Sequence, residues 1–256
     1  MNWDRHRWTL VAVGLIAGFL SGVFGVGGGI LVVPGLTILV GMDQRLAHGT
    51  SLAAIVPISL ASLITYWGHG HVDWPVALWL SIGALVGSII GTRFLAVVSK
   101  RNLALIFALV LVVSAIRLFI ATSGEGRQDL HLSAIFGLIA IGLVAGALAG
   151  LLGVGGGVVL VPAMIVLFGI ASVIAKGTSI AVIVPTAIMG TIRNRSATNV
   201  DLSAATIVGC AGILSAIGGG LLSSLLTETA SNVLFATLLI AVASRIVVQQ
   251  LRVPAS

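Results

Sequence analysis

The chain has 256 residues, of which 58% are hydrophobic and 8% are charged, against about a quarter charged in a typical soluble domain. With a mean hydropathy of +1.21, 13 Lys and Arg and 7 Asp and Glu side chains cannot cover a water-exposed surface. This excludes a soluble enzyme and a disordered chain, and the single cysteine, Cys210, excludes an internal disulfide. The net charge of +6 then reflects orientation in a membrane rather than nucleic-acid binding.

The first half of the chain predicts five apolar segments. The first is preceded by Arg5 and Arg7 but is followed by no small-residue cleavage motif, so we expect an uncleaved helix. A helix over the second segment would be about 20 Å long, short for about 30 Å of hydrocarbon. Because a Gly-Val-Gly-Gly-Gly run separates the first two segments, we expect a tilted hairpin or a re-entrant pair. The five segments are 8–24, 29–41, 46–67, 74–98 and 102–121.

The second half repeats the first at one constant offset. The stretch from Gly14 to Pro34 recurs from Gly142 to Pro162 without a gap, and Ala47–Ser51 recurs as Ala175–Ser179. Both prolines are expected within about the first turn of the helix after the break. The sequence therefore predicts one membrane domain made of two repeats, 1–128 and 129–256, joined near the polar run 122–129. The second set of segments is 131–152, 157–169, 175–192, 202–226 and 230–249.

An odd number of crossings in each half predicts that the two repeats have opposite orientations. We therefore expect an all-α polytopic membrane protein built as an inverted repeat of five plus five apolar segments, with about eight to ten transmembrane helices. The positive-inside rule then places both termini in the cytoplasm. The basic residues assigned to that side are Arg5, Arg7, Arg45, Arg93, Lys100, Arg101, Arg193, Arg195, Arg245 and Arg252.

The carboxylates argue against a cation pump. All seven lie at the ends of segments or in loops, whereas cation pathways and proton relays usually place one inside the membrane. No Gly-x4-Gly-Lys-Ser/Thr loop, Ser-His-Asp arrangement or His-Glu-x-x-His motif is present, so neither ATP hydrolysis nor an intramembrane hydrolase is indicated. No cofactor or metal is expected.

The contiguous glycines predict a candidate binding site. Helices that begin after the runs Gly27–Gly29 and Gly155–Gly157 would present free N–H groups and a positive dipole end. Two such ends would form an anion cradle near the midplane. Glycines spaced by four are interpreted as helix-packing faces instead. The cradle residues are Gly27, Gly28, Gly29, Gly155, Gly156 and Gly157, and the spaced glycines are Gly14, Gly18, Gly22, Gly83, Gly87 and Gly91.

A basic residue followed by two hydroxyls occurs at equivalent positions of both halves, and such a group suits a small oxyanion. The alternative is that the hydroxyls cap a helix and the basic side chains reach an interface. His48 could also carry a proton. Arg117 and Arg245 form a further equivalent pair with a gating or an anchoring role. The basic-hydroxyl residues are His48, Thr50, Ser51, Lys176, Thr178 and Ser179.

These residues together resemble the TauE/SafE (TSUP) family of membrane permeases from about Leu10 to Leu251. The resemblance is carried by Gly18-x3-Gly22-x2-Gly25-x-Gly27-Gly28-Gly29-x4-Pro34, by Ala47-x2-Thr50-Ser51 and by Gly70-x-Val72-Asp73-Trp74. In the second half Thr198 stands in place of Gly70. The resemblance implies a secondary transporter of the bacterial inner membrane for small sulfur-containing anions such as sulfite, thiosulfate, sulfoacetate or another organosulfonate.

The leading hypothesis is therefore a permease that works by alternating access. Its expected partners are the anion, the lipid bilayer and a coupling ion, H⁺ or Na⁺. A non-transporting membrane subunit or assembly factor is the alternative, and short loops argue against it. The substrate, the direction of transport and the oligomeric state stay open.

Overall fold

The computed structural model describes the backbone of residues 3–94, 99–120 and 131–252, and a few side chains inside the helices are not described. Within these residues the chain forms helices and no strand. The predicted junction, residues 122–129, lies outside the described residues. The helices of the first half are α1 (Trp3–Phe24), α2 (Gly29–Pro34), the π-helix η1 (Gly35–Leu39), α3 (Gln44–Gly68), α4 (Trp74–Phe94) and α5 (Lys100–Ile120). Those of the second half are α6 (Leu132–Leu152), α7 (Gly157–Phe168), α8 (Ser172–Ser196), α9 (Leu202–Leu225) and α10 (Glu228–Arg252).

The element bounds recur at the offset found in the sequence. Helix α3 begins at residue 44 and ends at 68, while α8 begins at 172 and ends at 196, so both ends are shifted by the same amount. The short helices α2 and α7 begin at Gly29 and Gly157, which are related by that same shift. A repeated sequence thus produces a repeated series of helices.

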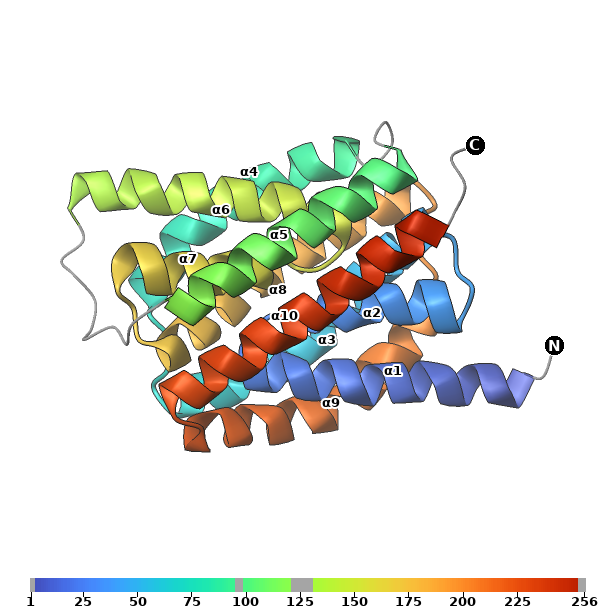
Figure 1. The fold of residues 1–256 in the computed structure, drawn as a ribbon, viewed down its shortest axis with the longest axis horizontal. Helices are drawn as coiled ribbons and strands as arrows, with labels where there is room; N and C mark the ends of the chain where they lie inside the picture. The colour runs from blue at the N-terminus through green and yellow to red at the C-terminus, as the bar shows by residue number, and fades with distance from the viewer. Residues whose placement is uncertain (1–2, 95–98, 121–130, 253–256) are drawn as a thin grey trace.

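The packing pairs helices across the two halves (Figure 1). Helix α4 lies along α6, α1 along α9, and α3 along α8, while α5 and α10 run together diagonally across the front of the view. The short α2 and α7 lie behind α5 and α10. Within the described residues neither half encloses a core by itself, because its principal contacts are made with the other half.

Spaced glycines explain how closely two of these pairs approach. A Cβ added at Gly18 would collide with the carbonyl of Gly212 on α9, and one added at Gly87 would collide with the carbonyl of Leu143 on α6. The glycines at the next turns of α1 and α4 face carbonyls of the same partner helices. The packing interpretation of the spaced glycines is confirmed, since small residues let two helix backbones touch.

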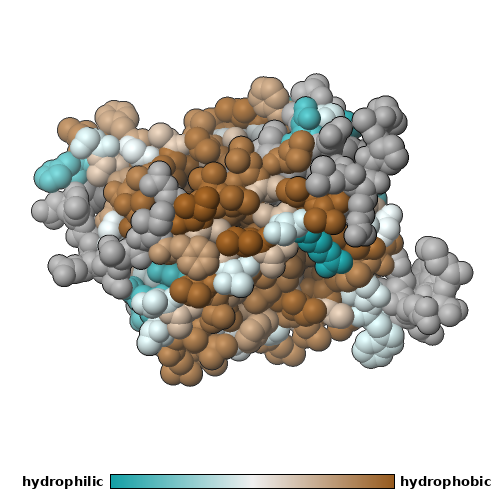
Figure 2. All heavy atoms as spheres, in the orientation of Figure 1, coloured by the Kyte–Doolittle hydropathy of each residue, from teal (hydrophilic) through white to brown (hydrophobic). Residues whose placement is uncertain are grey.

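The lengths and surfaces of the helices fit a lipid environment. Seven helices are long and apolar enough to cross a membrane among the described residues, and Gly29–Leu39 and Gly157–Phe168 are shorter apolar segments, as the sequence predicted. Hydrophobic atoms cover most of the visible face, and hydrophilic atoms gather mainly toward its two ends (Figure 2). Such an outer surface is suited to hydrocarbon and not to water.

The prolines after the breaks lie deeper in their helices than the sequence predicted. Pro34 and Pro162 are each the sixth residue of a helix, not part of the first turn. Proline cannot donate the backbone hydrogen bond of that position, and after Pro34 the helix continues as the π-helix η1. After Pro162, α7 continues as an α-helix to Phe168. The expectation failed because the breaks end at Gly28 and Gly156, which lengthens the helical stretch before each proline.

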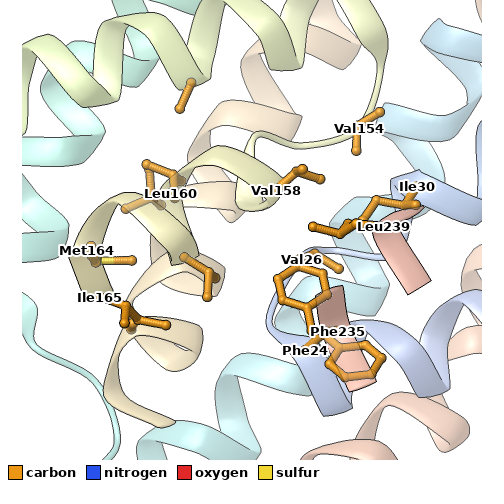
Figure 3. Packing of buried hydrophobic residues seen from close by; sticks show 14 of the residues in the cluster. Phe24, Val26, Ile30, Val154, Val158, Leu160, Met164, Ile165, Phe235 and Leu239 are labelled. Atoms are coloured by element: carbon orange, nitrogen blue, oxygen red, sulfur yellow. The ribbon is translucent and has the colours of Figure 1, made fainter. Parts of the chain in front are cut away.

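Apolar packing seals one side of both breaks (Figure 3). Val26 of the first break and Val154 of the second belong to one buried cluster that includes Phe235 and Leu239 of α10. Phe24 stacks on Phe235 with ring centroids 5.0 Å apart. Helix α10 therefore holds the two irregular segments in place by hydrophobic contact.

Candidate functional site

Two glycine-rich breaks lie between consecutive helices at the centre of the protein. The first spans Gly25–Gly28 between α1 and α2, and the second spans Gly153–Gly156 between α6 and α7. Gly28 and Gly156, which precede α2 and α7, have φ of 77° and 83°. Only glycine adopts this left-handed region without strain, which explains why the glycines are contiguous here.

The two breaks touch each other. A Cβ added at Gly29 would lie 2.5 Å from the Cα of Val154, and one added at Gly157 would lie 2.6 Å from the Cα of Val26. The structure therefore brings the two predicted glycine runs together, although they belong to different halves of the sequence.

Apolar side chains fill the space against the middle of each run. A Cβ added at Gly27 would lie 3.1 Å from Ile183 and 3.2 Å from Ile55. Gly155 faces the same two isoleucines, which form a small buried cluster with Leu52 and Ala187. In this conformation the glycine runs lie against a closed hydrophobic contact.

Each break packs against a buried basic residue of the opposite half. A Cβ added at Gly25 would lie 2.5 Å from Cβ and 2.6 Å from Cα of Lys176. A Cβ added at Gly153 would lie 2.6 Å from the carbonyl oxygen and 2.7 Å from Cα of His48. We call Gly25, Lys176 and Ser179 the Lys176 junction, and Gly153, His48 and Ser51 the His48 junction.

The Lys176 junction satisfies its cation. Lys176 is 2% exposed, and its ammonium donates hydrogen bonds to Ser231 and, at 3.4 Å, to Ser223. Ser223 also lies 2.9 Å from the Tyr66 hydroxyl, which hydrogen-bonds the carbonyl of Gly22 at 2.7 Å. A buried ammonium is costly unless polar partners surround it, and here α3, α9 and α10 supply them.

The His48 junction leaves its ring unsatisfied. His48 is also 2% exposed, yet neither ring nitrogen makes a hydrogen bond of normal geometry within the described part of the chain. Of the polar groups near the ring, the backbone of Leu152 interacts with it most strongly, but the contact does not reach normal hydrogen-bond geometry. A buried polar ring without partners is uncommon in proteins, and it marks a place where a ligand or water is expected.

The hydroxyls of the two junctions differ in the opposite way to the basic side chains. Ser51 donates a hydrogen bond of 2.8 Å to the carbonyl of Gly153. Ser179, its equivalent, is buried and has no hydrogen-bond partner among the described residues. One copy of the motif uses its serine to hold the opposite break, while the other copy leaves its serine free.

The two threonines have a structural partner. The Thr50 hydroxyl accepts a hydrogen bond of 2.9 Å from the N–H of Asp201, and the Thr178 hydroxyl accepts one of 2.9 Å from the N–H of Asp73. Through these bonds each threonine holds a loop of the opposite half, and the aspartates cap the helices that follow. The threonines therefore position these loops, and the bonds use the acceptor side of each hydroxyl.

The loops that cover the junctions have different chemistry. The carbonyl of His71 lies against Gly177, beside Lys176, and the carbonyl of Asn199 lies against Gly49, beside His48. His69 stacks on His71. Partial burial, and then the neighbouring His69, lower the pKa of His71.

Comparison with known proteins identifies the family. Residues 2–118 and 138–255 match the family described as "Sulfite exporter TauE/SafE". The chain belongs to this family. Its two matched stretches contain both glycine breaks and both junctions, so the family pattern and the contacts between the halves involve the same residues.

The relatives of this TauE/SafE chain are named as transporters. It is 30% identical over 207 residues to the probable membrane transporter protein YunE of Bacillus subtilis, covering 72% of this chain and 76% of YunE. It is 28% identical over 174 residues to a probable membrane transporter protein of Xylella fastidiosa, covering 66% and 67%. It is 28% identical over 185 residues to YdhB of B. subtilis, covering 71% and 76%. No solved structure matches.

Of the arginine pair for which a gating or an anchoring role was predicted, the structure describes one side chain, that of Arg245. Arg245 is exposed on α10, and the side chain of Arg117 lies outside the described residues. No group of three or more metal-ligating side chains occurs in the described ranges.

Sequence reasoning missed the partners of Lys176. It did not consider Ser223 and Ser231. One signal was available: Ser223 and Ser231 replace Leu95 and Leu103 of the first half. Hydroxyls in only one copy of a repeat indicate that this copy must satisfy a polar group which the other copy lacks.

Proposed function

We propose that this TauE/SafE protein is a secondary transporter that moves a small anion across the membrane by alternating access. The observation that carries the proposal is the pair of junctions, in which each glycine break packs on a buried basic residue of the opposite half. His48 and Lys176 are the buried basic side chains of the described residues, and the carboxylate that interacts with Lys176, Glu228, is half-buried at the start of α10. Positive or proton-binding groups buried inside a membrane without buried acids favour an anion as cargo.

The cargo in this proposal is a sulfur-containing anion such as sulfite, thiosulfate, sulfoacetate or another organosulfonate. Support comes from the family description, "Sulfite exporter TauE/SafE", and from the physical requirement for anion-binding groups. The anion would contact His48, Ser179, Lys176 and the N–H groups at the start of α7, where intrahelical bonding begins only with Val159. Coupling to H⁺ would use His48, whose ring is not committed to another group, and Na⁺ is the alternative coupling ion.

The proposed architecture is an inverted repeat, 1–128 and 129–256, with both termini in the cytoplasm and the protein in the bacterial inner membrane. Its support is the recurrence of the helix bounds at a constant shift and the one-sided distribution of basic residues. In such transporters two halves rock about a site between them. A C-terminal reporter that works only in the cytoplasm tests the orientation, and activity only outside would contradict it.

Reconstitution tests the transport itself. Purified protein in liposomes is loaded with sulfite, sulfate, thiosulfate or sulfoacetate, and efflux is measured with and without a pH gradient. We expect saturable flux of at least one anion above that of protein-free liposomes, and loss of that flux in the His48→Leu variant. Absence of flux for every anion, with correctly folded protein, would contradict the proposal.

A further inference from the structure

A polar cavity of about 290 Å³ lies between the end of α4 and the end of α8. It is distinct from the closed contact between the glycine breaks, and no carboxylate is among its lining residues. Two guanidinium groups, those of Arg93 and Arg193, border it from different helices. The other lining residues are Thr92, Asn194, Ser196, Ala197 and Asn199.

Two residues that line this cavity, Asn194 and Asn199, pack against the residue that follows His48. A Cβ added at Gly49 would collide with the carbonyl of Asn199 and would lie 3.0 Å from Cβ of Asn194. Gly49 directly follows His48 on α3. Asn194 is itself 2% exposed, and its amide donates a hydrogen bond of 2.9 Å to the carbonyl of Gly190. The cavity therefore lies against the segment of α3 that carries His48.

The two guanidiniums lie in the last turns of α4 and α8 and have no ion-pair partner among the described residues. Neither Arg93 nor Arg193 forms an ion pair or a hydrogen bond with any described residue, and the sequence explained both only as markers of membrane orientation. Two guanidiniums beside one low-dielectric cavity attract anions to it. Their planar donor pairs match the oxygen atoms of sulfonates, sulfite, sulfate and phosphate.

We propose that this cavity is a vestibule that collects a small oxyanion next to the His48 junction, through Arg93 and Arg193. The inference deepens the transport function proposed above and rests on it for the direction of onward movement. Binding in the vestibule does not itself require transport, so the two ideas can fail separately. A lipid phosphate headgroup has the same chemistry, and the experiment distinguishes it from a free anion.

The test uses the chain's single cysteine. Cys210→Ser removes the native thiol, and Ser196→Cys places a new one in the cavity lining. The labelling rates of an anionic and a cationic methanethiosulfonate reagent are measured in nanodiscs, each divided by its rate with a free thiol. We expect an anionic-to-cationic ratio of about 5 or more, which Arg93→Gln or Arg193→Gln lowers about threefold.

Arg195→Gln is the matched control. Arg195 lies two residues from Arg193 at the same helix end but does not line the cavity, so its removal changes the net charge equally. We expect the labelling ratio to change less in Arg195→Gln than in Arg193→Gln. Equal effects of the two substitutions, or no preference for the anionic reagent, would overturn the vestibule.

Two further arms identify the occupant and separate the two proposals. In zwitterionic lipid, sulfate should slow labelling more than chloride does at equal ionic strength. Slowing by phosphatidylglycerol but not by sulfate would assign the cavity to lipid headgroups and overturn the proposal. Sulfite efflux by the same wild-type protein is measured in parallel. If sulfite leaves the liposomes but the anionic reagent does not label faster than the cationic one, the vestibule alone is refuted. If the anionic reagent labels faster but no anion leaves the liposomes, transport alone is refuted.

Discussion

The His48 and Lys176 junctions have the same backbone arrangement and opposite side-chain chemistry. In both, a glycine of one half's break lies against the main chain of a basic residue of the other half. Lys176 has serine partners on α9 and α10, whereas His48 has no hydrogen-bond partner among the described residues. Ser51 is engaged, whereas its equivalent Ser179 is free.

The difference shows how the two copies of a duplicated sequence take on different roles, one structural and one in binding. Close backbone contact is required in both halves, and glycines are present at both contacts. The side chains around the contact are free to diverge, so one junction satisfies its basic group while the other leaves its ring nitrogens without partners among the described residues, beside a cationic cavity. We infer that the His48 junction is the one that meets the anion from the vestibule, and that Lys176 is the more structural of the two.

The largest expected effect comes from the shared backbone contact. Gly25→Ala and Gly153→Ala each add a Cβ within 2.7 Å of main-chain atoms, at φ of 70° and 67°. We expect a conformational cost of about 1–2 kcal/mol plus about 1–3 kcal/mol for overpacking, with strong loss of folded protein on size-exclusion chromatography. Gly70→Ala is the control, since it has φ of 72° and no atom within 4 Å. An equal loss of folded protein in all three variants would show that the contact is unimportant.

Lys176→Met should reduce both stability and flux. The methionine keeps the length of the side chain but removes the donors to Ser223 and Ser231. We expect the free energy of unfolding to fall by about 1–3 kcal/mol and anion efflux to fall at least about tenfold, the cost of about 1.4 kcal/mol in a barrier. Thermal unfolding and liposome efflux measure the two effects. Unchanged efflux would remove Lys176 from the transport pathway.

His48→Leu should separate the two properties. No hydrogen bond of normal geometry is lost, and a buried polar ring is replaced by an apolar side chain, so we expect a change in stability within about 0.5 kcal/mol or a small gain. Efflux should nevertheless fall at least about tenfold. A variant that loses stability as Lys176→Met does, or that transports normally, would contradict the proposed division of tasks.

The serine pair offers a smaller and internally controlled comparison. Ser51→Ala removes the hydrogen bond to the Gly153 carbonyl and should cost about 1 kcal/mol. Ser179→Ala removes a buried hydroxyl without a partner and should leave stability unchanged or slightly raised. Equal melting temperatures for both alanine variants would mean that the asymmetry does not persist in solution.

The smallest effect is expected in the loop over the His48 junction. Thr198 is the one non-glycine residue with positive φ in the described chain, at 57°, and its counterpart Gly70 has no such penalty. A β-branched residue is strained there, whereas asparagine tolerates this region. Thr198→Asn should therefore stabilise the protein by about 0.5–1 kcal/mol, measured by thermal unfolding. A lower melting temperature would contradict the strain argument.

Part of the candidate site was predictable because it depends on local chemistry. The positions of both glycine breaks, the aspartate caps and the packing role of Gly18 and Gly87 follow from rules that act within a helix turn or between adjacent helices. The cavity with Arg93 and Arg193 was not predictable in this way. Its two arginines belong to different halves of the sequence and are not at equivalent positions of the repeat, so no periodicity relates them.

By itself the sequence determined that the chain is a helical membrane protein, that the segments of its first half recur in the second and that one segment pair in each half is broken by glycine. These properties follow from composition and from backbone energetics, which need no knowledge of the partner helices. The tertiary structure decided which residues satisfy one another: Lys176 by Ser223 and Ser231, and Gly153 by Ser51. It also decided that isoleucines pack against both glycine breaks and that the His48 ring has no partner among the described residues. A buried polar group is satisfied only by partners within hydrogen-bond distance. Those partners come from helices that are distant in the sequence, so the sequence alone does not identify them.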